Sequence, residues 1–156
     1  MRVVKWGLIL AAGVELWTLV MGVTRWYAHP TLQALFWFVT LIELAVLVLA
    51  LRESRKRWLG QVGTGILVAI VAAPIIFGGS ILFTTVLFPD YFETLRAVHE
   101  SMLRAEGLAE PEIRAQVEAA AAMQTPIAQA AAGAIGTVLT ALVASAVIGI
   151  FVRAKD

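Results

Sequence analysis

The sequence contains no cysteine, has only 5 prolines, and carries little charge. Without cysteine, disulfides, thiolate metal sites and a cysteine nucleophile are excluded. Its 12 Lys and Arg residues and 11 Asp and Glu residues leave a formal net charge of +1, so no basic field would recruit nucleic acid. Hydrophobic residues make up 60% of the chain, against about 45–50% in soluble domains. We therefore expect residues 1–156 to form a single membrane domain.

Long apolar runs account for most of the chain. The four runs are residues 6–27, 32–51, 61–88 and 126–152. Because about 20 apolar residues cross the hydrocarbon core as a helix, each run is long enough to span a bilayer. The first run is too long for a cleaved signal peptide and lacks a clear cleavage site, so we interpret it as a signal anchor that is retained. The pattern predicts an all-α integral membrane four-helix bundle.

The third run is longer than the hydrocarbon core requires, so its helix must tilt, kink or protrude. Pro74 is the expected position of a kink, because proline removes a helical hydrogen bond. Gly78, Gly79 and Ser80 follow it closely. Together these residues form a candidate for the broken-helix element found in transporters.

The distribution of basic residues predicts the orientation in the membrane. Eight of them flank the runs on the side shared by both termini and the 52–57 loop: Arg2, Lys5, Arg52, Arg55, Lys56, Arg57, Arg153 and Lys155. Cytoplasmic loops carry an excess of Lys and Arg. We therefore expect both termini and this loop to be cytoplasmic.

The segment 89–125 is the only sizeable part predicted to lie outside the bilayer. Apolar residues recur at helical spacing after Asp90 until Gly107 ends a first helix, and a second helix begins near Glu110. We expect an extracytoplasmic amphipathic helical hairpin between the third and fourth spans. It would lie on the bilayer or cap the bundle, and the alternative is a ligand-binding lid.

The order of these segments resembles a known family. The stretch FPDYFETLRAVHESMLRAEGLAEPEIRAQVEAAAAMQTPIAQA at 88–130, with its G-x-x-E-x-E-I turn between two spans, is similar to the bacterial membrane family called domain of unknown function 4199. The resemblance covers nearly the whole chain, although the family's Phe-Gly at the start of the third span is replaced by Leu59 and Gly60. It implies a bacterial cytoplasmic membrane protein, and it implies no activity, cofactor or catalytic residue.

Two acidic residues, Glu15 and Glu43, lie near the middle of predicted spans. An ionised carboxylate is costly at that depth, so such residues are functional-site candidates. In an antiparallel pair of helices both would lie about 12–14 Å from the cytoplasmic end. Thr18 and Thr40 accompany them on the same faces. The carboxyl groups either share a proton for proton coupling or cation binding, or are protonated and hydrogen-bond neighbouring helices.

The last run carries a ladder of small residues at every fourth position. Its members are Gly133, Thr137, Ala141, Ser145 and Gly149. On a helix they form one stripe where another backbone can approach closely, which is how helices associate in lipid. The ladder is therefore predicted to be a helix-packing face.

The basic loop and the glycines after it invite a phosphate-binding interpretation. A P-loop is excluded, because Lys and Ser or Thr must follow its last glycine, whereas Ile66 follows Gly65. The basic side chains either contact anionic lipid headgroups or only orient the protein. The candidates for lipid contact are Arg52, Arg55, Lys56 and Arg57.

No pattern in the sequence favours catalysis. His29 and His99 are far apart and form no metal-ligand motif, and no Ser-His-Asp arrangement is recognisable. We expect no cofactor, no metal and no enzymatic activity. The leading hypothesis is an accessory or scaffold subunit, as a homo-oligomer or in a larger membrane complex. The alternative is a small proton- or cation-coupled transporter or channel, which a water-accessible cavity around the carboxylates would favour over a dry interface.

Overall fold

The computed structural model describes residues 2–152, and within them every regular element is helical. The long helices are α1 (Arg2–Val23), α2 (Phe38–Ser54), α3 (Trp58–Leu82), α4 (Tyr91–Ala105), α5 (Glu110–Met123) and α6 (Pro126–Val152). Two 3-10 helices, η1 (Trp26–Ala28) and η2 (Leu32–Trp37), join α1 to α2, and a π-helical turn, η3 (Phe83–Leu87), extends α3. Four stretches are long and apolar enough to span a membrane: 2–23, 32–54, 58–87 and 126–152. The all-α prediction with four candidate spans is confirmed.

The first span differs most from its predicted bounds. It covers 2–23 rather than 6–27, because Arg25 adopts a left-handed backbone with φ 54° and ends the helical path. Arg25 also places its guanidinium 3.7 Å from Asp90. The second span continues to Ser54, where Arg55 ends it with φ 46°.

The third span is not broken at Pro74. Helix α3 runs continuously from Trp58 to Leu82, with Pro74 inside it. Proline deprives only the Ile70 carbonyl of its helical partner, and the helix keeps the remaining backbone groups paired, as an apolar environment demands. The prediction of a broken-helix element at Gly78, Gly79 and Ser80 is therefore wrong. The irregularity lies further on, in the π-helical turn.

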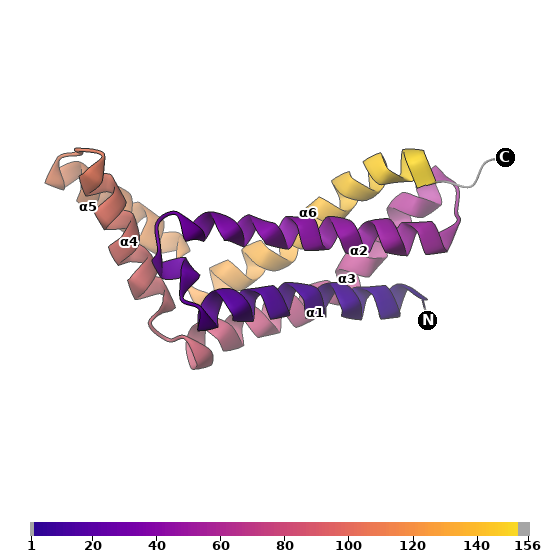
Figure 1. The fold of residues 1–156 in the computed structure, drawn as a ribbon, viewed down its shortest axis with the longest axis horizontal. Helices are drawn as coiled ribbons and strands as arrows, with labels where there is room; N and C mark the ends of the chain where they lie inside the picture. The colour runs from indigo at the N-terminus through magenta and orange to yellow at the C-terminus, as the bar shows by residue number, and fades with distance from the viewer. Residues whose placement is uncertain (1, 153–156) are drawn as a thin grey trace.

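The four candidate spans form a bundle in which α6 crosses α3 and α1 packs beside α2 (Figure 1). At the crossing of α3 and α6, a Cβ on Gly65 would lie 2.5 Å from the Ser145 Cβ. Near the end of α6, Trp58 donates a hydrogen bond of 2.9 Å to the Ala146 carbonyl. Buried side chains of all four helices fill the centre, among them Leu10, Leu47, Val68 and Ala141.

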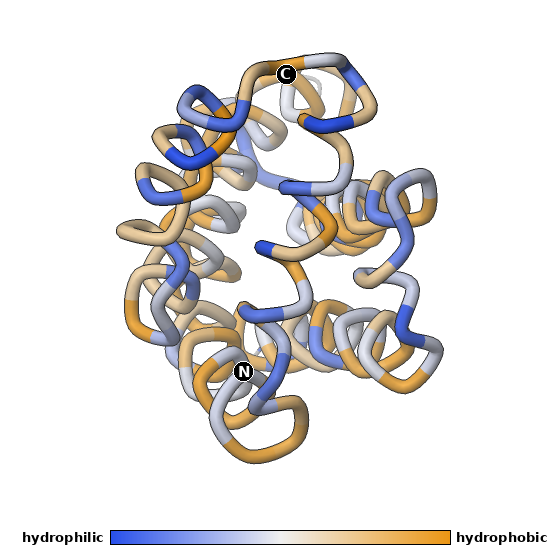
Figure 2. Tube along the Cα trace, turned by 90° about the vertical axis from the view of Figure 1, so that its left-hand side faces the viewer, coloured by the Kyte–Doolittle hydropathy of each residue, from blue (hydrophilic) through white to orange (hydrophobic). Residues whose placement is uncertain are grey.

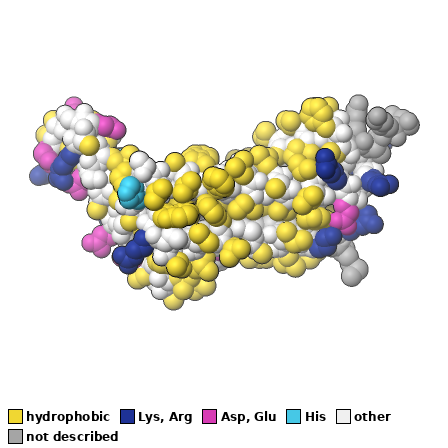
Figure 3. All heavy atoms as spheres, in the orientation of Figure 1, with side chains coloured by type: hydrophobic (Ala, Val, Ile, Leu, Met, Phe, Trp, Pro, Cys, Tyr) yellow, Lys and Arg dark blue, Asp and Glu magenta, His cyan; other side chains and the backbone are white. Residues whose placement is uncertain are grey.

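Hydrophobic side chains cover the outside of the bundle between two charged ends (Figure 3). Large apolar residues are unusually exposed there, with Leu16 at 64%, Trp37 at 79% and Phe151 at 81%. A soluble monomer rarely shows an apolar surface of this extent. Figure 2 views the molecule from the end that carries α4 and α5, and hydrophilic residues recur along the chain nearest the viewer. The apolar outside of the bundle supports a multi-pass membrane protein.

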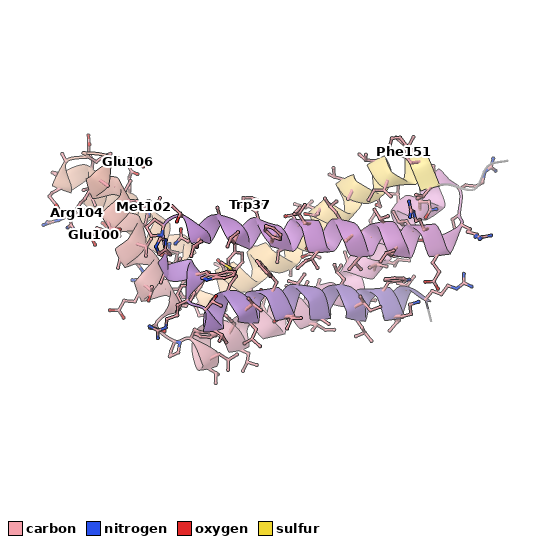
Figure 4. The ribbon with its side chains drawn as sticks, viewed as in Figure 1. Trp37, Glu100, Met102, Arg104, Glu106 and Phe151 are labelled. Atoms are coloured by element: carbon pink, nitrogen blue, oxygen red, sulfur yellow. The ribbon has the colours of Figure 1, made fainter. Side chains whose placement is uncertain are left out.

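Helices α4 and α5 project from one end of the bundle and pack against each other (Figure 1). Gly107 turns the chain between them with φ 82°, a conformation that glycine adopts without strain. Arg104 reaches across the turn to Glu110 at 3.0 Å and back along α4 to Glu100 at 2.6 Å. Figure 4 shows Arg104 and Glu100 at this end, with Glu106 and Met102. The turn therefore lies where Gly107 was predicted to end the helix.

An aromatic cluster joins α4 to the bundle. Tyr27 and Tyr91 have ring centroids 4.9 Å apart, and Phe83 packs edge-on to Tyr91 at 5.3 Å. Phe88 packs at a tilt against Phe83, and Gly22 lies beneath both rings, where a side chain would overlap them. The cluster lies at the same end of the bundle from which α4 and α5 project (Figure 1).

Candidate functional site

The candidate site is a cavity of about 100 Å³ inside the bundle. Among the described residues, Glu15 of α1 contributes the only acidic side chain to its lining. Glu15 lies eight residues before the end of α1, which places it about 12 Å below that end at 1.5 Å per residue. Measured from the basic end of the helix, Glu15 lies 13 residues beyond Arg2, or about 20 Å, rather than the predicted distance of about 12–14 Å, because α1 begins at Arg2 and not at Trp6.

Polar side chains of α1 and of four other segments complete the lining of the cavity. They are Thr18 of α1, Ser80 of α3, Thr84 of η3, Tyr91 of α4, and Gln129 and Thr137 of α6. The remaining wall is apolar, with Phe36, Val39, Ile76 and Phe83 among its residues. A water molecule occupies about 30 Å³ of the liquid, so the cavity has room for a few waters or one small ligand.

Several of these polar groups are not engaged by the protein itself. Within residues 2–152, the Glu15 carboxylate and the side chains of Ser80 and Gln129 form no hydrogen bond. The hydroxyls of Thr18 and Thr84 donate to backbone carbonyls at 2.9 Å, so their oxygen lone pairs stay available as acceptors. The lining therefore offers acceptor groups around one carboxylate.

Gly79 fixes the place of the Glu15 carboxylate. The carboxylate lies directly over the Gly79 backbone, and a Cβ at that position would overlap it. Gly78, the neighbouring residue on α3, has open space where its side chain would be. The predicted cluster of small residues after Pro74 thus serves to admit a side chain from α1.

Glu43 has a different environment. It is only 3% exposed, and the Thr137 hydroxyl donates a hydrogen bond of 2.6 Å to its carboxylate. Thr140, on the same helix, is a second hydrogen-bond partner. Thr40, named with Glu43 from the sequence, is half-buried and belongs neither to these bonds nor to the cavity lining. Glu43 thus joins α2 to α6 in a buried, hydrogen-bonded contact.

Thr137 belongs to the surroundings of both carboxyl groups. No hydrogen bond joins Glu15 to Glu43 among the described residues. Thr137 lines the cavity with Glu15 and also binds Glu43. The two acidic residues thus face a cavity and a helix contact respectively.

The predicted small-residue ladder lies mostly against α3. Thr137, Ala141, Ser145 and Gly149 are buried, whereas Gly133 is exposed beside the cavity. Ser145 fits against Gly65, and a Cβ on Gly149 would lie 3.1 Å from the Gln61 Cβ. The ladder is thus occupied within the chain, and an intermolecular contact would need another surface.

The basic loop lies at the opposite end of the bundle from the cavity and the aromatic cluster. Arg52, Arg55, Lys56 and Arg57 are all exposed. Lys56 lines a second hollow between helix ends. Arg153 and Lys155, counted with the basic side in the sequence, lie outside the described residues.

The sequence pattern missed the polar contacts that cross between helices. Gln61 of α3 is fully buried, bonded to Ser54 of α2 and donating to the Val152 carbonyl at 3.3 Å. Thr84 and Gln129 were also missed as cavity residues. One signal in the sequence could have identified them. Two polar residues inside an apolar run lie on the same face of a helix when four or eight positions separate them, as four separate Ser80 from Thr84.

Metal ligands do not cluster in the part of the chain that the structure describes. There, no group of three or more His, Asp or Glu side chains converges. His29 instead lies 3.1 Å from the Thr31 hydroxyl through its Nδ1 atom. The cavity therefore offers one carboxylate with neutral oxygen groups, which is a weak donor set for a divalent ion.

Comparison with known proteins places the chain in a family. Residues 5–154 match the model of the family described as Protein of unknown function (DUF4199). The chain belongs to this family. The resemblance drawn from the 88–130 stretch is thereby confirmed, although the description of the family names no activity. No curated protein and no solved structure matches the chain.

Proposed function

We propose that this protein binds a proton or a small monovalent cation at Glu15, inside its transmembrane bundle, as part of cation-coupled transport. The observation that carries the proposal is the cavity of about 100 Å³ in which the Glu15 carboxylate meets unengaged polar side chains. A water-accessible carboxylate at this depth favours transport over assembly. The proposed role involves no enzymatic step and no cofactor.

The chemistry of the lining supports a monovalent ligand. In a low dielectric, a lone carboxylate is neutralised either by a proton or by one positive charge nearby. The hydroxyls of Thr18, Ser80 and Thr84 are neutral, so they can replace water around a cation without adding charge. A divalent cation would retain an uncompensated positive charge there.

The position of the cavity supports access from one end of the bundle. Its lining extends from Glu15 and Thr137 in the spans to Tyr91 at the start of α4. The π-helical turn η3 contributes Phe83 and Thr84, and such turns often occur at functional sites. We propose that the ligand enters beside α4, on the side of the membrane facing α4 and α5.

Charge displacement on a solid-supported membrane tests the proposal. Rapid jumps of pH, Na⁺ or K⁺ are applied to liposomes containing the purified protein. We expect a transient current that Glu15→Gln reduces at least tenfold and that Glu43→Gln largely retains, because an amide oxygen at position 43 can still accept the Thr137 hydroxyl proton. An equal current from Glu15→Gln and the unchanged protein would end the proposal.

A second candidate function, an accessory or scaffold subunit, is favoured by the projecting pair α4 and α5. Met102 is 36% exposed there among the charged side chains of Glu100, Arg104 and Glu106 (Figure 4). Such a projection suits contact with a partner protein beyond the bilayer. Purification in mild detergent with mass measurement tests this role: a reproducible stoichiometric companion supports it, and a lone monomer or homo-oligomer opposes it.

We propose the bacterial cytoplasmic membrane as the location, with both termini cytoplasmic. The basic residues of the first turn of α1 and of the α2–α3 loop support this orientation, since positive loops stay inside. Helices α4 and α5 would then lie on the extracytoplasmic side. The cavity would accordingly open outward.

A further inference from the structure

A second cavity, of about 120 Å³, lies between the ends of α1, α2 and α3, at the end of the bundle opposite α4. Two cationic side chains line it, Arg2 from the start of α1 and Lys56 from the α2–α3 loop. The rest of the wall is mostly apolar, with Val3, Trp6, Ala50 and Val68, and also includes the hydroxyl side chains of Ser54 and Thr64. The cavity therefore combines positive charge at its rim with a hydrophobic interior.

The charges around this cavity do not cancel. Glu53 is the acidic side chain among them, and it is shared by Arg2 at 3.7 Å and Lys5 at 2.9 Å. The Trp6 indole also donates to the Glu53 carboxylate at 2.7 Å, which fixes the ring in the wall. Lys56 forms no ion pair with any other residue between 2 and 152. Arg2, Lys5 and Lys56 against Glu53 leave a net positive site.

We propose that this cavity binds a phosphate group, with Arg2 and Lys56 holding the anion and the apolar wall accepting the carbon chain of a phospholipid. Arginine presents a planar set of donors that matches phosphate oxygens, and lysine adds a point charge. Basic pockets between helix ends at the membrane surface are suited to anionic headgroups. A free phosphate would use the same two cations without the wall.

The rest of the basic loop provides an internal comparison. Arg52 and Arg55 are exposed at the same end of the bundle but do not line the cavity. If retention of an anion depended on overall positive charge, removing Arg52 and Arg55 would lower retention as much as removing Arg2 and Lys56. If retention depends on the cavity, only the loss of Arg2 and Lys56 lowers it.

Native mass spectrometry of the full chain tests the proposal after reconstitution with phosphatidylglycerol and phosphatidylcholine. Arg2→Gln with Lys56→Gln removes two charges from the cavity, and Arg52→Gln with Arg55→Gln removes two from outside it. We expect the first pair to lower retained phosphatidylglycerol about tenfold and the second pair to lower it less than twofold. Equal losses from both pairs, or no retained phosphatidylglycerol in the unchanged protein, would overturn the phospholipid assignment.

Thermal unfolding in phosphatidylcholine nanodiscs, with and without inorganic phosphate, distinguishes the two sources of the anion. A rise in melting temperature with phosphate that Arg2→Gln with Lys56→Gln abolishes assigns the site to free phosphate. Stabilisation only by phosphatidylglycerol, sensitive to the same pair, assigns it to phospholipid. If neither anion raises the melting temperature of the unchanged protein more than it raises that of the Arg2→Gln with Lys56→Gln variant, the cavity binds no phosphate group. The outcome is independent of Glu15, which lies in the other cavity.

Discussion

Gly79 is the residue on which the position of the Glu15 carboxylate depends. The carboxylate occupies the space that any side chain at position 79 would need. A flexible side chain can swing aside at low cost, so an added methyl group moves the carboxylate without unfolding the helix. The geometry of the cavity can thus be altered while its charge is kept.

We predict that Gly79→Ala reduces the cation-induced current several-fold, because the displaced carboxylate no longer faces the other polar groups. Gly78→Ala is the matched control, since open space surrounds that position. It should leave the current unchanged and should slightly favour the helix, as alanine does over glycine. The measurement is the charge displacement proposed for Glu15, and equal currents from the two variants would contradict the role assigned to Gly79.

Tyr91 provides a second prediction for a single residue. Burial, followed by the proximity of Tyr27, raises the pKa of Tyr91 to about 12 from its ordinary value of 10.0. The neutral form is therefore favoured in the folded protein, so this contribution to stability is complete below pH 10 and is lost as the pH rises from 10 to 12. Two pKa units correspond to about 2.7 kcal/mol.

Tyrosinate absorbance during an alkaline titration measures this effect, because the chain has only 2 tyrosines. We expect the Tyr91→Phe variant to lose the step near pH 12 and to unfold less steeply between pH 10 and 12. If both tyrosines of the unchanged protein ionised near pH 10 without unfolding, the packing described for Tyr91 would be wrong.

Among the elements, α3 and α6 form the contact that the small-residue ladder predicted. Gly65 is its tightest point, with the Ser145 Oγ 2.8 Å and the Ala141 carbonyl 3.4 Å from where a Cβ would lie. We predict that Gly65→Ala destabilises the bundle by about 1–3 kcal/mol through overpacking. Gly63→Ala, at an open position on the same helix, should not destabilise it. Thermal unfolding in detergent compares the two variants, and equal melting temperatures would contradict the packing.

The turn between α4 and α5 should respond to acid. Hydrogen bonding and charge attraction from Arg104 lower the pKa of Glu110 below its ordinary value of 4.5. The ion pair therefore stabilises the turn above pH 4.5, and its contribution is lost as the pH falls through the lowered pKa. Hydrogen exchange should show less protection around Gly107 in acid, and Glu110→Gln should show the same loss at neutral pH. Protection that is unchanged in both cases would indicate that the pair does not hold the turn.

The elements that follow from local sequence were predictable, and the contacts between distant segments were not. Runs of 20 or more apolar residues identified the four spans, and Gly107 marked the turn. The end of α1 was misplaced because the left-handed backbone of Arg25 has no signal in hydropathy. The different environments of Glu15 and Glu43 depend on how α6 crosses the bundle, which brings Thr137 to Glu43 across 94 positions of sequence.

For the whole molecule, the absence of cysteine makes the orientation directly testable. A single introduced cysteine can be labelled with a membrane-impermeant maleimide in intact cells. We expect labelling of Ser101→Cys, which is exposed on α4, and none of Arg52→Cys, which is exposed at the opposite end. Disrupting the cells should expose Arg52→Cys as well. The reverse pattern in intact cells would invert the proposed orientation and the side to which the cavity opens.

The Thr137 hydroxyl has one proton, so it can donate only one hydrogen bond at a time. While that proton is donated to Glu43, only the oxygen lone pairs of Thr137 remain for the cavity. A protonated Glu43 can donate to Thr137 instead, and the hydroxyl proton is then free to turn toward the cavity. The wall opposite Glu15 would change from an acceptor of hydrogen bonds, which suits a cation, to a donor, which suits an anionic carboxylate. One hydroxyl thus allows the buried helix contact to alter which partner the cavity prefers.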